Sequence, residues 1–169
     1  MVCHDPQIGG ITVGEATCEQ LPDVPRLDQV VQRYAQRAFL DIELKVRGLE
    51  SEVLLTLQRH PPEKGFLVSS FLPEVIQELR LRNANVPLGI ICDHGNDLPA
   101  CFDLPVEFIV AHHSLVKGEV IRKTHESGRQ LLVWTVNDRK AMQRLADWGV
   151  DGIISDQTER LVQTLRRRS

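Results

Sequence analysis

Short apolar runs alternate with amphipathic segments along most of this chain. The first amphipathic segment predicts a helix, because apolar residues fall at positions 27, 30, 31 and 34, on one helical face. Further helices are predicted at 49–60, 73–84, 117–127, 138–148 and 157–168. Strands are predicted at 39–46, 65–69, 87–92, 107–111, 131–136 and 152–155. The segment 93–105 fits either a short helix or a loop.

Strands that are separated by helices predict βαβ units and a parallel sheet. Two architectures are consistent with this order, a doubly wound open sheet and a TIM-type (β/α)₈ barrel. No G-x-G-x-x-G sequence follows a predicted strand, so the signature of a dinucleotide-binding sheet is missing. Six strands are two fewer than a complete barrel requires.

The predicted strand at 39–46 favours the barrel because of its charges. Side chains alternate between the two faces of a strand, so Asp41, Glu43 and Lys45 share one face and apolar residues occupy the other. Burying charged groups is costly unless they are paired or bind a metal. In a barrel, one strand face points inward and the carboxyl ends of the strands carry the chemistry. We therefore expect this strand to end in a functional site.

Composition and charge narrow the class of protein. The chain has 169 residues, 42% of them hydrophobic, and a net charge of −3, as expected for one globular domain. No basic stripe is present, which argues against a nucleic-acid partner. No apolar run is long enough to span a membrane, and no signal peptide is recognisable. The four cysteines lack C-x-x-C spacing, so we expect free thiols and a cytoplasmic location.

Several short motifs occur in an order that is typical of one enzyme family. They are His4-Asp5, DIELK at 41–45, SSF at 69–71, PLGII at 87–91, WTVN at 134–137 and DGIISD at 151–156. In this order and spacing the chain resembles the glycerophosphodiester phosphodiesterase family. The resemblance covers essentially the whole chain.

The resemblance implies a (β/α)₈ barrel that hydrolyses glycerophosphodiesters to glycerol 3-phosphate and an alcohol such as choline or ethanolamine. It also implies a divalent cation, Ca²⁺ or Mg²⁺, at the mouth of the barrel, and acid/base catalysis by two histidines. By motif, His4 matches a catalytic histidine and Glu43 a metal ligand. Lys45 matches a phosphate-binding lysine, and Trp134 an aromatic residue near the substrate pocket.

Each of these residues also has a simpler interpretation. Without the family resemblance, His4 would be a frayed terminal histidine. Glu43 and Lys45 would form an ion pair inside the barrel. Trp134 would equally serve as a core aromatic residue. The pair at 112–113 follows a predicted strand and would lie at the barrel mouth, as rim polarity, a substrate contact or a metal ligand.

The chain departs from the family pattern at its beginning. The family's His-Arg-Gly and Glu-x-Asp motifs, which belong to the first two strands, do not occur in it. We therefore expect a single, N-terminally truncated domain over residues 1–169, with about six of the eight βα units. Two alternatives follow from this expectation. The chain is a catalytically inactive partial barrel, or copies of it associate as a homo-oligomer that covers the exposed sheet edges.

Overall fold

The computed structural model describes residues 1–5, 7–13 and 15–166. Its main feature is a sheet of six parallel strands. These strands are β3 (Leu40–Glu43), β4 (Phe66–Ser70), β5 (Leu88–Cys92), β6 (Phe108–His112), β7 (Gln130–Trp134) and β8 (Gly152–Ile153). The predicted number, order and parallel direction of the strands are confirmed.

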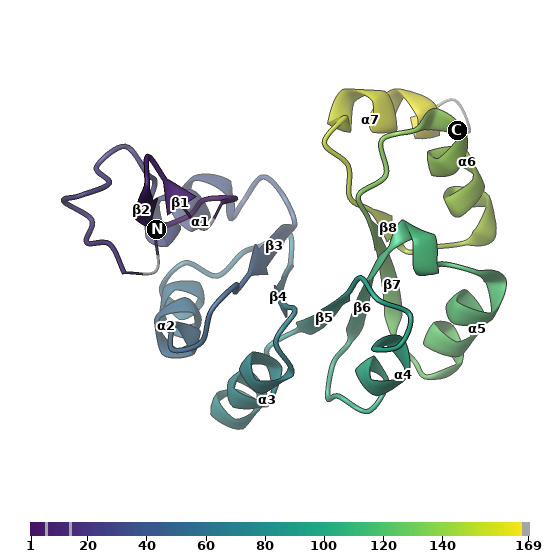
Figure 1. Ribbon diagram of the computed structural model, residues 1–169, viewed down its shortest axis with the longest axis horizontal. Helices are drawn as coiled ribbons and strands as arrows, with labels where there is room; N and C mark the ends of the chain where they lie inside the picture. Colours follow the sequence, from purple (N-terminus) through teal and green to yellow (C-terminus); the bar gives the residue numbers. More distant parts are fainter. Residues whose placement is uncertain (6, 14, 167–169) are drawn as a thin grey trace.

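The strand order in space is the order in sequence, β3-β4-β5-β6-β7-β8. Each strand therefore pairs with its predecessor after a helical crossover, as in a (β/α) barrel. Within the described chain the sheet is an open, partial barrel, and β3 and β8 each have one neighbouring strand. Figure 1 shows β3 and β8 on different sides of the molecule.

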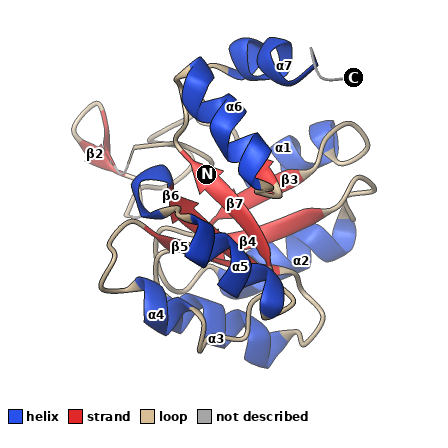
Figure 2. Cartoon of the chain, turned by 90° about the vertical axis from the view of Figure 1, so that its right-hand side faces the viewer, coloured by secondary structure: helices blue, strands red, loops and turns tan. Residues whose placement is uncertain are grey.

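Helices occupy the connections between the strands. They are α1 (Leu27–Tyr34), α2 (Glu50–Arg59), α3 (Pro73–Arg82), α4 (Leu98–Cys101), α5 (Gly118–Glu126), α6 (Arg139–Trp148) and α7 (Thr158–Arg166), with a 3₁₀ turn at His113–Leu115. Figure 2 views the molecule from the side of α5 and α6, behind which the sheet lies. No helix in the described part of the chain is both long and apolar enough to cross a membrane.

The hydrophobic core lies between the sheet and these helices. Alternate strand residues such as Val68, Ile90 and Ile109 are fully or almost fully buried there, together with Ile76 of α3 and Met142 of α6. The other strand residues point to the concave face that would be the barrel interior. This alternation places Asp41 and Glu43 on the concave face, as predicted from the charged strand.

Two details differ from the expectation, namely an added hairpin and a shorter first strand of the parallel sheet. A short antiparallel hairpin, β1 (Gln7–Ile8) and β2 (Ile11–Thr12), was not predicted, because two-residue strands carry no periodic signal. The strand at 39–46 is shorter, since β3 ends at Glu43. The ambiguous segment 93–105 contains the one-turn helix α4. The last predicted helix is observed as α7, which is described as far as Arg166, and its expected continuation to residue 168 lies outside the described residues.

Candidate active site

The carboxyl ends of the six parallel strands meet at one edge of the sheet, which we call the mouth. Parallel strands bring their carboxyl ends together, and catalytic groups of barrel enzymes lie there. The concave-facing residues at this edge come from the end of β3 and the segment just after it, from the ends of β6 and β7, and from the residues that directly follow β4 and β5. They are Glu43, Lys45, Phe71, Asp93, His112 and Trp134.

Glu43 and Lys45 form an ion pair at the end of β3. Lys45 Nζ lies 3.4 Å from Glu43 Oε2, and the two side chains are 42% and 30% exposed, respectively. Both groups therefore remain accessible to a ligand that approaches the mouth. The pairing interpretation of these two residues is confirmed, and their roles as metal ligand and phosphate contact stay predictions.

Two serines of β4 fix the backbone between Glu43 and Lys45. The buried hydroxyl of Ser70 donates to the carbonyl of Leu44 at 2.7 Å, and the Leu44 amide donates to the carbonyl of Ser69 at 2.8 Å. Buried polar groups that are fully hydrogen-bonded make a segment rigid. These bonds hold the backbone on both sides of Leu44 and thereby orient Glu43 and Lys45.

Asp41 lies one step deeper along the same face of β3. The hydroxyl of Ser69 donates to Asp41 Oδ1 at 2.7 Å. The side chain of Asp41 is exposed in part, but nearby protein atoms displace water from its carboxyl group. This loss of hydration raises the pKa of Asp41 above its ordinary value. The hydrogen bond from Ser69 opposes the rise and the negative charge of Glu43 adds to it. Asp41 is thus hydrogen-bonded to the neighbouring strand β4.

An aromatic cluster joins the residue after β4 to the ends of β6 and β7. The rings of Phe71 and Trp134 meet edge to face, with centroids 5.6 Å apart, and His112 contacts Trp134 at 5.2 Å. The indole Nε1 of Trp134 donates to the carbonyl of Val110 at 3.1 Å. Trp134 is half-buried, so it is not a core aromatic residue in the full sense. Its ring is held against the sheet by the hydrogen bond to Val110.

His112 is held by its neighbours in a defined orientation. Its Nδ1 is 2.7 Å from the hydroxyl of Ser114, and its ring lies 4.2 Å from that of His113. Partial burial lowers the pKa of His112, His113 lowers it further, and Asp93 partly opposes this effect. A neutral imidazole at neutral pH follows.

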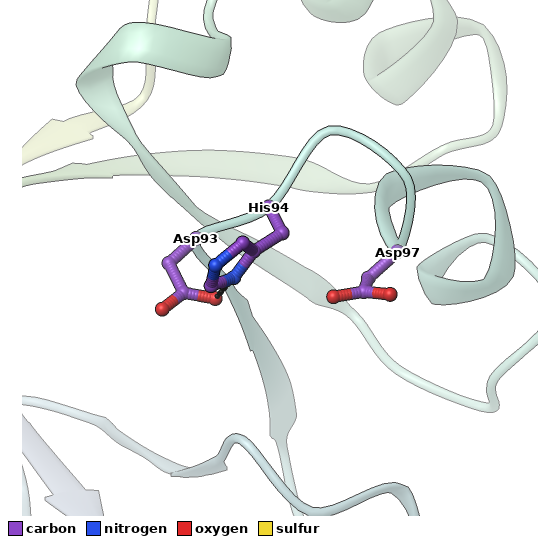
Figure 3. Close-up of side chains that lie close together, drawn as sticks. All are labelled: Asp93, His94 and Asp97. Carbon is purple, nitrogen blue, oxygen red and sulfur yellow. Dashed lines mark hydrogen bonds and ion pairs between the residues drawn. The ribbon is translucent and has the colours of Figure 1, made fainter.

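Asp93, His94 and Asp97 form a second group of ligand-type side chains, shown in Figure 3. One ligand atom from each residue lies within 4.8 Å of the others, and all three residues are exposed. His94 Nδ1 lies 2.6 Å from Asp93 Oδ1, and this contact raises the pKa of His94. The sequence patterns did not predict this group, because the segment 93–105 fitted either a short helix or a loop.

Two thiols lie beneath the loop that carries this group. Cys92 donates to the carbonyl of His94 and Cys101 to the carbonyl of Asp97, each at 3.4 Å. Burial raises the pKa of both thiols, that of Cys101 to about 12. All four cysteines are free, as the sequence predicted.

His4 lies apart from these groups. Its side chain is 93% exposed, and its Nδ1 is 2.8 Å from Asp5 Oδ1. Among the described residues, no hydrogen bond, ion pair or ring contact connects His4 with Glu43, Lys45 or Trp134. The catalytic role of His4 therefore stays a prediction.

A groove of about 660 Å³ lies between α6 and α7, away from the mouth. Its lining includes Arg139, Lys140 and Arg144, whose guanidinium lies 5.3 Å from the ring centre of Trp148. We place the candidate site at the mouth instead, because the strand ends gather carboxylate, ammonium, imidazole and aromatic groups there.

Comparison with known proteins identifies the family. The glycerophosphoryl diester phosphodiesterase family matches residues 13–160. A glycerophosphodiester phosphodiesterase of Caldanaerobacter subterraneus subsp. tengcongensis is 25% identical over 166 residues, which cover 94% of this chain and 68% of the relative. One from Bacillus subtilis is 25% identical over 150 residues, covering 79% of this chain and 51% of the relative. The chain thus spans about half to two thirds of these relatives.

Solved structures show the same fold. A glycerophosphodiester phosphodiesterase from Parabacteroides distasonis superposes with a TM-score of 0.84 at 22% identity, covering 98% of this chain and 77% of that protein. An Oleispira antarctica phosphodiesterase in complex with sn-glycerol-3-phosphate gives a TM-score of 0.72 at 21% identity, covering 84% of this chain and 61% of that one. The partial barrel matches TIM-barrel structures of this kind, and the chain belongs to the glycerophosphoryl diester phosphodiesterase family.

Proposed function

We propose that the protein hydrolyses glycerophosphodiesters to glycerol 3-phosphate and an alcohol, with the help of a divalent cation. The observation that carries the proposal is the accessible Glu43–Lys45 pair, at the mouth of a sheet whose sequence matches this family. The relatives bear the name of this activity, and one solved relative contains glycerol 3-phosphate as its product.

Glu43 is the residue that would hold the cation. A carboxylate is the ligand type that Mg²⁺ and Ca²⁺ prefer, and this one is accessible and fixed through the backbone bonds of Ser69 and Ser70. Further oxygen ligands are needed, because these ions take six to eight. A bound cation would neutralise charge on the phosphate and polarise its oxygens.

Lys45 would contact an anionic phosphate oxygen with its ammonium group. The ammonium is a compact charge on a flexible side chain. When the phosphodiester binds, the ammonium would leave the carboxylate of Glu43 and pair with the phosphate. Trp134 would offer only its ring to the substrate, because its single N–H already donates to Val110. His4 would transfer a proton to or from the reacting oxygens, as histidine does near neutral pH.

The test is release of glycerol 3-phosphate from glycerophosphocholine or glycerophosphoethanolamine. We expect release with Mg²⁺ or Ca²⁺, its loss with a chelator, and its loss in Glu43→Gln. A correctly folded protein that releases no glycerol 3-phosphate under any of these conditions would contradict the proposal. It would favour the inactive partial barrel instead.

We further propose that the chain is cytoplasmic and associates with itself through the edges of its sheet. Its four thiols are free, which suits a reducing compartment. β3 and β8 each leave one side without a neighbouring strand among the described residues, and such edges favour association. Sedimentation should show a mass that rises with protein concentration, and a monomer at all concentrations would contradict self-association.

A further inference from the structure

The aromatic surface at the mouth extends beyond what the proposed chemistry uses. Phe71 follows β4 and Trp134 ends β7, yet their ring centroids are only 5.6 Å apart. β5 and β6 lie between these two strands, so the rings meet above the ends of other strands. Phe71 is 41% exposed, which leaves part of this surface open to solvent.

Negative charge lies beside this aromatic surface. Asp93 directly follows β5, between the strands that carry Phe71 and His112, and its side chain is 42% exposed. The charge of Asp93 acts on His112, which itself contacts Trp134. Asp97 adds a second carboxylate within 4.8 Å of the ligand atoms of Asp93 and His94.

Positive charge is largely compensated or absent on the same surface. Burial favours the neutral imidazole of His112, and the ammonium of Lys45 is paired with Glu43. The imidazole of His94 lies against Asp93, and Asp97 adds a second carboxylate, so two carboxylates share one imidazole there. Aromatic faces attract cations through their quadrupole, most strongly when a carboxylate is near and water is excluded. Rings and carboxylates together therefore favour a cation over a neutral or anionic group.

We propose that Phe71, Trp134 and Asp93 form a subsite for a positively charged alcohol group of the substrate, either an ammonium or a methylated ammonium. The negatively charged phosphate of the substrate would then lie near Lys45, and its positively charged alcohol group would lie near Asp93. This inference rests on the proposed function for the phosphodiester substrate. The competing occupant is the uncharged glycerol end, whose carbon atoms would pack on the same rings.

Binding of choline by the protein tests the subsite without any catalysis. In a Trp148→Phe background, Trp134 is the sole tryptophan and reports binding by fluorescence. We expect choline to bind about tenfold more tightly than its uncharged analogue in which carbon replaces nitrogen. Asp93→Asn should weaken choline binding several-fold, while Asp103→Asn, which changes an exposed carboxylate in the loop before β6, should not.

A second pair of variants tests the aromatic part. Phe71→Leu should weaken choline binding, and Phe39→Leu, which changes another exposed phenylalanine at the amino end of β3, should leave it unchanged. Equal binding of choline and its uncharged analogue, or equal effects of Asp93→Asn and Asp103→Asn, would overturn the subsite. Equal kcat/KM for cationic and neutral glycerophosphodiesters would overturn it while leaving the proposed function intact. Choline binding without any hydrolysis would contradict the proposed function alone.

Discussion

The ammonium nitrogen of Lys45 lies 3.4 Å from a carboxylate oxygen of Glu43, the last residue of β3, two positions earlier in the chain. The contact follows from the two-residue period of a strand, which directs both side chains to the concave side. Each charge compensates the other while both remain accessible. If a cation and a phosphate bound together, Glu43 would pair with the cation and Lys45 with the phosphate, in place of their contact with each other.

Replacement of Glu43 by glutamine should prevent the divalent cation from binding at this position. The amide keeps the size of the carboxylate but removes its negative charge, so we expect kcat/KM to fall by about a hundredfold or more. The midpoint of thermal unfolding should also lose its dependence on added Mg²⁺ or Ca²⁺. Glu52→Gln on α2 is the matched control, and an equal loss in both variants would argue against a ligand role for Glu43.

Replacement of Lys45 by methionine should act mainly on substrate binding. Loss of a charge-assisted contact to phosphate should raise KM by about tenfold, with a smaller effect on kcat. Metal binding should persist, because the carboxylate of Glu43 is freed from its partner. Lys64→Met, in the loop before β4, serves as the control. An unchanged KM in Lys45→Met would refute the phosphate contact.

The order and direction of the strands could be predicted from sequence, because apolar runs of β-type and helical period alternate clearly. The concave position of Glu43 followed from the same alternation. The contact between Phe71 and Trp134 could not be predicted, since it joins strands three positions apart in the sheet and depends on the curvature of the sheet. The group at Asp93, His94 and Asp97 depends on the path of a loop, which periodicity does not determine.

Asp41 should make the stability of the fold depend on pH. The pKa of Asp41 is raised in the folded state, so the folded protein binds its proton more tightly than the unfolded chain. The contribution of Asp41 to the free energy of unfolding should therefore fall as pH rises from about 4 through the folded pKa, and stay constant above it. Asp41→Asn removes this contribution and can still accept the hydrogen bond from Ser69.

Urea unfolding of Asp41→Asn and the unsubstituted protein at about pH 4 and about pH 7 measures this effect. We expect the variant to gain stability relative to the unsubstituted protein as the pH rises. Asp103→Asn, whose side chain is exposed, controls for the loss of one negative charge. A relative stability that is constant with pH, or that changes in the opposite sense, would contradict the raised pKa of Asp41.

The cysteines should divide into two classes of reactivity. Cys18 is exposed and Cys3 is partly exposed, whereas Cys92 and Cys101 are buried. The thiolate is the reactive form, so the rise in the pKa of Cys101 from 9.0 to about 12 should reduce its reactive fraction by about a thousandfold. A thiol reagent should modify two cysteines rapidly and the other two only after unfolding. Rapid modification of all four would contradict the burial of this pair.

Replacement of Gly89, in the middle of the sheet, by a larger residue should destabilise the fold. A Cβ atom there would lie 2.9 Å from Leu67 Cδ1 and 3.1 Å from Val110 Cγ2, which is closer than carbon atoms pack. Both neighbours are buried strand side chains with little freedom to move. Overpacking of this kind costs about 1–3 kcal/mol, so Gly89→Ala should lower the free energy of unfolding by that amount.

The matched control for Gly89→Ala is Gly118→Ala at the first position of α5. A Cβ at Gly118 would meet no heavy atom within 4 Å, so alanine there should be neutral or slightly stabilising. Chemical denaturation of the two variants separates steric overlap from the general effect of replacing glycine. Because Gly89 lies on β5, between the strands bearing Glu43 and Trp134, its substitution should also disturb the mouth. Equal stability of the two variants would show that β5 accommodates the added methyl group by a shift of the sheet.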